Sequence, residues 1–280
     1  MDIIKARAEM REYSSRRRAE GKTIGLVPTM GALHEGHLCL IRSARRECGV
    51  VVVSLFVNPT QFGPAEDLDK YPRTFDADCA ACERSGVDAL FAPAPEEMYR
   101  PGAETCVVQE RLAKMLEGAT RPTHFQGVLT VVLKLFNIAA PHVAYFGQKD
   151  YQQTVVIRRM AADLDVPVDV SVVPTVREND GLAMSSRNRY LAPDERRQAA
   201  CICEALKQCR ERFAAGERSA EKLKAVMRRR IDKEPSARLD YVEIAKPETL
   251  EPAGTVEPGD VALVAAFIGE TRLIDNAILD

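Results

Sequence analysis

Two histidines that stand three residues apart, His34 and His37, are the side chains of this 280-residue chain whose type and spacing most suggest chemistry. They follow an apolar run that ends at Val27 and precede a run with helical spacing, so they fall at a predicted strand-to-helix turn. Both imidazoles can project from one face of a first helical turn, where unpaired N–H groups and the positive end of the helix dipole favour phosphate. Gly31 and Gly36 let a bulky anion approach the backbone. The segment therefore predicts an anion-binding site.

Three other interpretations of this segment are weaker. The string His-Glu-Gly-His is one residue shorter than the zinc-protease motif, and the remaining histidines, His124 and His142, lack ligand-like spacing, so zinc is disfavoured. A purely structural role suits a single surface histidine better than a pair of histidines accompanied by two nearby glycines. A Walker phosphate-binding loop at 21–23 is rejected, because Arg16 stands where that motif needs glycine and because the motif should follow a strand.

The composition is that of an ordinary globular protein, with 46% hydrophobic and 29% charged residues. A net charge of −2 gives no electrostatic ground for binding nucleic acid or an anionic membrane, and three arginines at 16–18 are predicted to form a solvated helix face. No apolar run suits a membrane span, and the first residues lack the apolar core of a signal peptide. We therefore expect a cytoplasmic protein without disulfides, in which Cys79 and Cys82 are buried thiols on an amphipathic helix.

Alternating strands and helices are predicted to position the histidines. After an opening helix, five apolar runs predict strands, and the run at 50–57 is so uniformly apolar and β-branched that it predicts a parallel strand covered on both faces. The intervening helical segments imply right-handed crossovers and a parallel sheet. The expected fold class is therefore α/β, with a Rossmann-like domain. The strands are predicted at 24–27, 50–57, 87–92, 143–146 and 168–173, and the helices at 75–85, after the loop 117–127, and at 151–164.

The pattern changes after Val176, where helices precede neighbouring strands instead of alternating with them. This order predicts a smaller α+β domain. We expect a larger domain at 1–176 and a smaller C-terminal domain at 177–280 that acts as a lid. The predicted helices of the second domain are 193–214 and 219–231, and its strands are 239–244, 261–268 and 271–276.

Four polar loops follow predicted strands, at 29–37, 58–61, 147–153 and 177–187. The carboxyl ends of parallel strands meet at one sheet edge, so these loops are expected to converge. Beside the two imidazoles they carry Lys149, Ser185, Ser186 and Arg187, which suit a nucleotide. Alone, Lys149 is equally well explained as solvated surface and Ser185 as part of a helix cap. The four loops together favour a nucleotide site.

Several longer strings within and beside these loops closely resemble the pantothenate synthetase (pantoate–β-alanine ligase) family. The string around the two histidines marks the wider nucleotidylyltransferase superfamily, whereas Asn-Pro-Thr-Gln-Phe and Lys-Asp-Tyr-Gln-Gln are specific to this family. One departure is Gln148, where the family more often has glutamate. The resemblance extends to Asn276. It is carried by the segments 28–37, 56–62, 71–74, 147–153, 180–188 and 273–276.

The resemblance implies a condensation of (R)-pantoate with β-alanine that consumes ATP, releases AMP and pyrophosphate and passes through a pantoyl adenylate. It places nucleotide and pantoate in the domain 1–176, and it implies Mg²⁺ as a companion of ATP and a homodimer. No residue is assigned as a metal ligand, and neither nucleic acid nor membrane is expected as a partner. The expected catalytic residues are His34, His37, Lys149, Ser185 and Arg187. The implied pantoate-binding residues are Gln61 and Gln153, and Gln61 also serves β-alanine. The implied ATP-binding residues are Met30, Gly31, Ala32, Leu33, His34, Glu35, Gly36, His37, Gly147, Gln148, Lys149, Asp150, Val176, Met184, Ser185, Ser186 and Arg187.

Two rival functions share part of this pattern. A nucleotidylyltransferase that leaves AMP on its product would share the histidine turn, but it does not explain Asn58, Gln61 and Gln153. A sensor that only binds nucleotide would not require Lys149, Ser185 and Arg187 together.

Overall fold

A computed structural model of the chain describes residues 1–64 and 66–280, which divide into two compact units. The first unit contains Met1–Gly147 and Gln152–Pro174, and the second contains Gln148–Tyr151 and Thr175–Asp280. The predicted ranges 1–176 and 177–280 differ from this division chiefly because they leave 148–151 in the first domain. The backbone therefore passes from one unit to the other three times.

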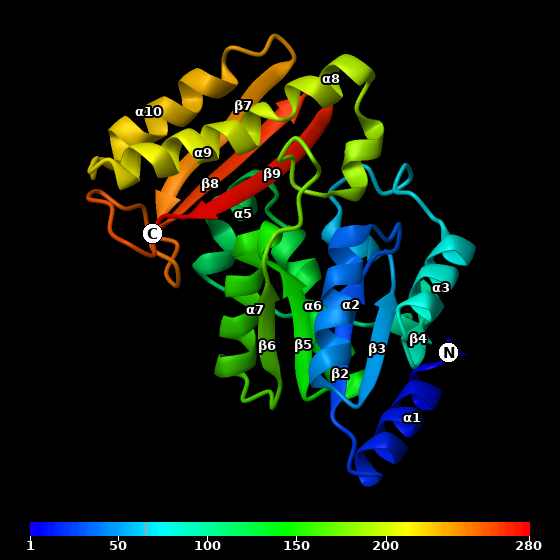
Figure 1. Ribbon diagram of the computed structural model, residues 1–280. Helices are drawn as coiled ribbons and strands as arrows, with labels where there is room; N and C mark the ends of the chain where they lie inside the picture. The colour runs from blue at the N-terminus through cyan, green and yellow to red at the C-terminus, as the bar shows by residue number, and fades with distance from the viewer. Residues whose placement is uncertain (65) are drawn as a thin grey trace. The chain divides into compact units, whose positions relative to one another are not determined.

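The first unit is built on a six-stranded parallel sheet in the order β1-β4-β3-β2-β5-β6, of which Figure 1 labels β2 to β6. Its two central strands β2 and β3 are almost wholly buried, as their apolar sequences predict. The α/β fold class is confirmed. The edge strand β1 was not predicted, because it has only three residues and two of them are exposed. The strands are β1 (Asp2–Ile4), β2 (Ile24–Thr29), β3 (Val50–Leu55), β4 (Ala89–Phe91), β5 (Val143–Gly147) and β6 (Asp169–Val173).

Helices connect these strands and bury their apolar faces on the sheet. In α2 (Glu35–Glu47), Leu40, Ile41 and Ala44 pack with Val51 and Val53 of β3. Figure 1 shows this helix running along the face of the sheet beside β2. The predicted loop at 117–127 instead contains a short helix and the start of α6. The other helices are α1 (Arg7–Ala19), α3 (Phe75–Arg84), α4 (Pro95–Met98), α5 (Glu117–Thr120), α6 (His124–Ala139) and α7 (Tyr151–Asp163), with short 3-10 helices η1 (Pro59–Gln61) and η2 (Leu112–Lys114).

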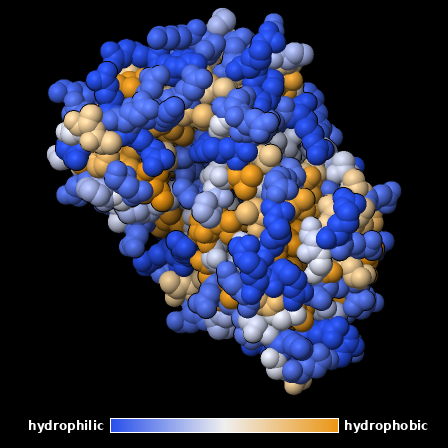
Figure 2. All heavy atoms as spheres, in the orientation of Figure 1, coloured by the Kyte–Doolittle hydropathy of each residue, from blue (hydrophilic) through white to orange (hydrophobic). Residues whose placement is uncertain are grey.

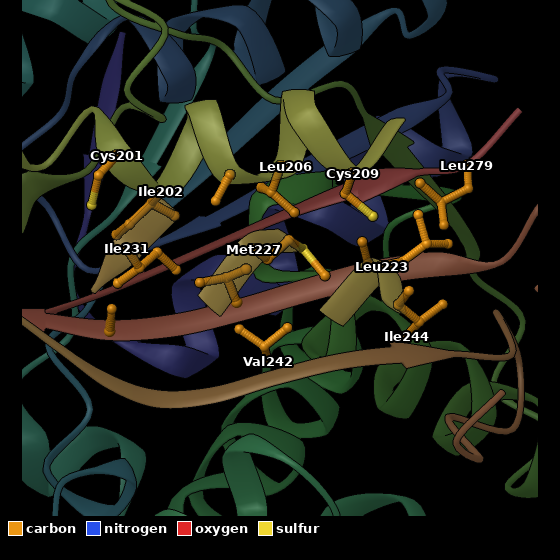
Figure 3. Packing of buried hydrophobic residues seen from close by; sticks show 14 of the residues in the cluster. Cys201, Ile202, Leu206, Cys209, Leu223, Met227, Ile231, Val242, Ile244 and Leu279 are labelled. Carbon is orange, nitrogen blue, oxygen red and sulfur yellow. The ribbon is translucent and has the colours of Figure 1, made fainter. Parts of the chain in front are cut away.

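The second unit is a three-stranded antiparallel sheet, in the order β7-β8-β9, covered by two helices. Its core is a single cluster in which Leu206 of α9 and Met227 of α10 face Val242 of β7 (Figure 3). The predicted α+β architecture is confirmed. The elements are η3 (Gln148–Asp150), η4 (Ser186–Tyr190), α8 (Pro193–Gln198), α9 (Cys201–Ala214), α10 (Ala220–Ile231), β7 (Ala237–Ala245), β8 (Val261–Ile268) and β9 (Thr271–Ile278).

The prediction of one helix over 193–214 is wrong, because the segment forms two helices, α8 and α9. At the break the Ile202 amide donates to the carbonyl of Ala199 rather than to a residue four positions back. Such a bond tightens one turn in the 3-10 manner. Alanine favours continued helix, so the residues at the break, Ala199 and Ala200, do not predict it.

The outer surface follows the charge pattern of the sequence. Arg16 and Arg18 are exposed on α1, in agreement with the predicted solvated face, and Figure 2 shows mostly hydrophilic residues over α1 and α10. On α3, Cys82 is fully buried as predicted, whereas Cys79 is half-buried, and burial raises the pKa of both thiols. None of the helices within residues 1–64 and 66–280 combines the length and apolar character that a membrane span needs.

Candidate functional site

Three of the four polar loops begin at one edge of the parallel sheet. They follow β3, β2 and β5, which are neighbours in that order. The chain moves outward from β2 through β3 to β4 and later returns to the other side of β2 with β5. The strand order therefore reverses between β2 and β5, and in open α/β sheets ligands bind beyond the carboxyl ends of the strands at such a reversal. The loops at 29–37 and 58–61 lie together in the first unit, whereas most of the loop at 147–153 and the loop at 177–187 belong to the second unit, so the convergence of all four stays a prediction.

The two histidines open α2, at the carboxyl end of β2. His34 is the N-cap residue, and its Nδ1 accepts a hydrogen bond from the Gly36 amide at 3.2 Å. The Nδ1 of His37 accepts from the His34 amide at 3.3 Å, and the ring centroids are 4.1 Å apart. Because both Nδ1 atoms accept, a neutral ring at either position carries its proton on Nε2. Each Nε2–H is then a hydrogen-bond donor suited to a phosphoryl oxygen.

The backbone between β2 and α2 is held in a rare conformation. Gly31 and Ala32 have φ angles of +86° and +50°, and the second of these is uncommon for a residue with a side chain. Asp78, which is 2% exposed, accepts from the Ala32 amide at 3.0 Å and from the Leu33 amide at 2.8 Å. The Thr74 hydroxyl donates to the same carboxylate at 3.1 Å. A buried carboxylate of α3 thus fixes the turn that leads to the histidines.

Gln61, predicted to bind pantoate, is buried beside the histidine turn. Its Nε2 donates to the Met30 Sδ at 3.0 Å, and its Oε1 accepts from the Asn58 amide group at 3.2 Å. The same Asn58 nitrogen donates to the Gly127 carbonyl at 3.1 Å, and the Asn58 Oδ1 accepts from the Tyr99 hydroxyl at 2.9 Å. The structure therefore brings together Met30, assigned to ATP, and Gln61, assigned to pantoate.

The main chain of Gln61 is held from the start of α6. The His124 Nδ1 lies 2.9 Å from the Gln61 carbonyl oxygen, and the Arg121 Nη2 donates to that oxygen at 3.4 Å. A carbonyl oxygen only accepts, so His124 carries its proton on Nδ1. Gly127 permits the close approach of α6, because a Cβ atom there would lie 2.4 Å from the Thr60 carbonyl oxygen.

Two ionisable groups near Gln61, His124 and Glu66, have shifted pKa values. Burial, aided by the Arg121 charge, lowers the pKa of His124 to about 4. Arg121 also pairs with Glu66 at 2.6 Å and with Glu117 at 3.2 Å. Burial opposes ionisation of Glu66, but the hydrogen bond and charge of Arg121 outweigh it, so the pKa of this carboxyl is lowered. His124 is therefore neutral at pH 7, while Glu66 and Arg121 form an ion pair.

Lys149 lies in η3, which belongs to the second unit. Its Nζ is 3.2 Å from the Asp150 carboxylate, and its side chain is 19% exposed. Tyr151, the next residue after η3, donates its hydroxyl proton to the Pro247 carbonyl at 3.2 Å. The Tyr151 contact holds the end of η3 to the second unit, although β5 directly before it belongs to the first.

The segment 176–187 forms a closed turn within the second unit. The Met184 amide donates to the Val176 carbonyl at 3.0 Å, and Arg177 and Ala183 form an antiparallel bridge. Ser185 is the N-cap of η4, and its Oγ accepts from the Arg187 amide at 3.3 Å. The capping role that the sequence left open for Ser185 is thus present.

The other predicted site residues differ in how far they are buried. Glu35 is exposed on α2 and pairs with Arg42, Gly147 ends β5, and Gln153 is half-buried in the first turn of α7. Ser186 is buried and Arg187 is half-buried in η4. Across 1–64 and 66–280, His, Cys, Asp and Glu side chains nowhere gather in a group of three that could hold a metal ion.

Sequence reasoning missed the residues that hold this site in place, namely Asp78, Arg121 and His124. Each acts on the backbone of a distant loop, so no short motif contains both partners. The only local signals are an aspartate in the first turn of a predicted helix and the polar loop before α6, and both have ordinary structural explanations.

Comparison with known proteins gives consistent matches over the whole chain. A family model described as pantoate-beta-alanine ligase matches residues 2–278. The chain is 54% identical to a pantothenate synthetase of Acidobacterium capsulatum over 99% of this chain and 95% of that one. It is 53% identical to a pantothenate synthetase of Thermotoga petrophila over 100% of both chains.

Solved structures agree with these sequence matches. The crystal structure of pantothenate synthetase from Thermus thermophilus has a TM-score of 0.95 and 48% identity, over 100% of this chain and 99% of that chain. A pantoate-beta-alanine ligase from Francisella tularensis, complexed with beta-gamma ATP and beta-alanine, has a TM-score of 0.81 and 34% identity, over 99% and 97%.

Proposed function

The chain belongs to the pantoate–beta-alanine ligase family, and on this premise we propose how its residues divide the work of an ATP-dependent ligation. The enzyme forms an amide bond between pantoate and β-alanine, with ATP as the substrate that drives the reaction.

The proposed route has two steps. A carboxylate oxygen of (R)-pantoate attacks the α-phosphorus of ATP, the bond from that phosphorus to the bridging oxygen breaks, and pyrophosphate leaves. The amine of β-alanine then attacks the carbonyl carbon of the pantoyl adenylate. The bond from this carbon to the AMP oxygen breaks, and the nitrogen loses a proton. ATP enters as its Mg²⁺ complex, in which the cation offsets part of the phosphate charge.

His34 and His37 are assigned to the phosphoryl group under attack. Negative charge grows on its oxygens in the first step, and donors aimed at that charge lower the barrier. The observation that carries this assignment is the pair of Nδ1 acceptors at 3.2 and 3.3 Å, which places the proton of each neutral ring on Nε2. Lys149, Ser185 and Arg187 supply the further donors and cations for the triphosphate, together with the backbone of the predicted ATP-binding residues.

Gln61 and Gln153 are assigned to pantoate, and Gln61 also to β-alanine. Neutral amides can hold hydroxyl groups and a carboxylate without pairing the nucleophilic oxygen in a strong ion pair. Support for Gln61 comes from its burial and from the two residues that fix it: Asn58 at its side chain and His124 at its carbonyl. A fixed amide loses little entropy when the substrate binds.

Product analysis tests the proposal. Purified protein is incubated with Mg–ATP and with pantoate, β-alanine, both or neither, and AMP, pyrophosphate and pantothenate are measured. We expect pantothenate and stoichiometric AMP only when both acids are present. A nucleotidylyltransferase would instead leave AMP attached to its product. A Lys149→Met variant, which keeps an unbranched side chain one atom shorter but removes the charge, is expected to lose ATP affinity.

We further propose a homodimer in the cytoplasm, as the family resemblance implies. Sedimentation equilibrium of the purified chain tests the dimer, and a monomer at all concentrations would contradict it.

A further inference from the structure

The last strand of the second unit contacts both segments of that unit assigned to ATP. β9 contacts η3, which contains Lys149, and η4, which contains Ser186 and Arg187. Two consecutive residues of β9, Asp275 and Asn276, are 4% and 2% exposed. Consecutive side chains leave a strand on opposite sides, so this short stretch can reach two segments at once.

The side chain of Asn276 holds η3 by binding backbone carbonyl oxygens of that helix. The Asn276 Nδ2 donates to the carbonyl oxygens of Gln148 and Lys149, both at 2.9 Å. The Asn276 Oδ1 accepts from the Gln148 Nε2 at 3.3 Å. One buried amide therefore uses both of its protons and its oxygen on η3. Two fixed carbonyls define the direction of the backbone from which the Lys149 side chain leaves.

Asp275 holds the other segment through a two-point ion pair. The Arg177 guanidinium donates to the two Asp275 oxygens at 2.6 and 3.1 Å, and Arg177 also donates to the Gly181 carbonyl at 3.0 Å. Paired N–H donors on a carboxylate set orientation as well as distance. Gly181 has a φ of +91°, and a Cβ there would lie 2.5 Å from the Cys203 Sγ, so the turn before Ser185 tolerates little change.

We propose that Asp275 and Asn276 are positioning residues that hold, from one strand, both ATP-binding segments of the second unit. The inference rests on the proposed roles of Lys149, Ser185 and Arg187. Neither Asp275 nor Asn276 touches substrate in this scheme. Asn276 acts by orienting Lys149, and Asp275 acts through Arg177 on the turn that leads to Ser185.

The main test is Asn276→Asp, which keeps the shape of the side chain but removes both donated hydrogen bonds. Losing two bonds of ordinary strength predicts about a 30-fold fall in kcat/KM for ATP. The pantoate dissociation constant, measured by calorimetry, should stay unchanged because Gln61 and Gln153 lie outside this unit. Asn276→Ser restores one donor and should give an intermediate loss. Asn137→Asp makes the same substitution on the exposed side of α6 and serves as the control.

Coupling to Lys149 separates positioning from a general loss of stability. ATP affinity is measured for Asn276→Asp alone and in a Lys149→Met background. If Asn276 acts through Lys149, its effect should shrink to less than about threefold in that background, since coupled residues are not additive. The proposal would be overturned if the loss of ATP affinity in the double variant equalled the product of the two single losses. A fully active Asn276→Asp protein would also overturn it. If Asn276→Asp does not fold, the same comparisons with Asn276→Ser decide.

Arg177→Lys tests the second segment. It keeps a cation beside Asp275 but loses the two-point bond, so we expect about a tenfold loss in kcat/KM for ATP. Parental activity of this variant would remove Asp275 from the proposal. Failure of the proposed function has a different signature: the parent would form no AMP with both acids, or Lys149→Met would bind ATP as the parent does.

Discussion

Replacing Asp78 by asparagine should damage the histidine turn without changing the size of any side chain. In the parent, the two carboxylate oxygens accept three hydrogen bonds, from the amides of Ala32 and Leu33 and from the Thr74 hydroxyl. An asparagine amide has one acceptor oxygen, and its NH₂ group would face a backbone N–H. At least one buried donor is then left without an acceptor.

The expected loss of stability follows from the number of buried donors that lose their acceptor. One buried, unsatisfied N–H costs about 1–3 kcal/mol. For a chain of this size, a loss of about 2 kcal/mol lowers Tm by roughly 4–8 °C. Activity should fall further than stability alone explains, because Gly31 and Ala32 hold positive φ angles and the relaxed turn no longer presents His34 and His37 together.

Three measurements on purified Asp78→Asn protein decide this prediction: thermal unfolding, the rate of AMP formation, and amide exchange at Ala32 and Leu33. Asp76→Asn is the matched control, because Asp76 lies in the same first turn of α3 and is exposed. We expect faster exchange at Ala32 and Leu33, with β3 amides unaffected. An Asp78→Asn protein with parental Tm and parental rate would refute the reasoning.

Four further substitutions test the site. His37→Ala should slow AMP formation by about 10²–10³-fold, the usual loss for one donor to a developing oxyanion; near-parental pyrophosphate release would remove His37 from the mechanism. Gln61→Ala and Gln153→Ala should each weaken pantoate binding by about 1–3 kcal/mol, while ATP binding measured by calorimetry changes less; equal losses for both ligands would contradict the assignment. The depressed pKa of His124, about 4 against 6.5, means that the unfolded chain binds a proton first as pH falls, so stability is full above pH 6.5 and is lost toward pH 4. Between pH 7 and pH 5 the parent should lose about 2 kcal/mol more than His124→Gln in urea unfolding, and identical pH profiles would refute it.

The sheet and the histidine turn were predictable because their signals are local. The uniformly apolar run of β3 is typical of a strand buried on both faces, and the glycines around His34 and His37 follow another such strand directly. Asp78 was not predictable as a turn anchor. Its contact with Ala32 spans 46 residues, and an aspartate in a first helical turn is already explained by the helix dipole.

The same distinction applies to the second unit. Its helices and strands show clear periodicity, but the break between α8 and α9 falls on two alanines that favour helix. The attachment of η3 to β9 was not predictable from the sequence either. Asn276 binds carbonyl oxygens, which every residue carries, so neither the sequence of η3 nor that of β9 specifies the pairing.

The backbone passes between the two units three times, and this limits where the chain can be cut into separate domains. A single proteolytic cut near residue 174 does not separate two self-contained modules, because Gln148–Tyr151 stays with the N-terminal fragment while its hydrogen-bonding partner Asn276 leaves with the other. Exchange of residues 175–280 with those of a relative by gene fusion is expected to be less disruptive. The incoming Asn276 meets the same two carbonyl oxygens whatever side chains residues 148 and 149 carry. Where the incoming C-terminal unit carries asparagine at position 276, recombination is expected to keep this attachment, whereas excision of either unit on its own breaks it.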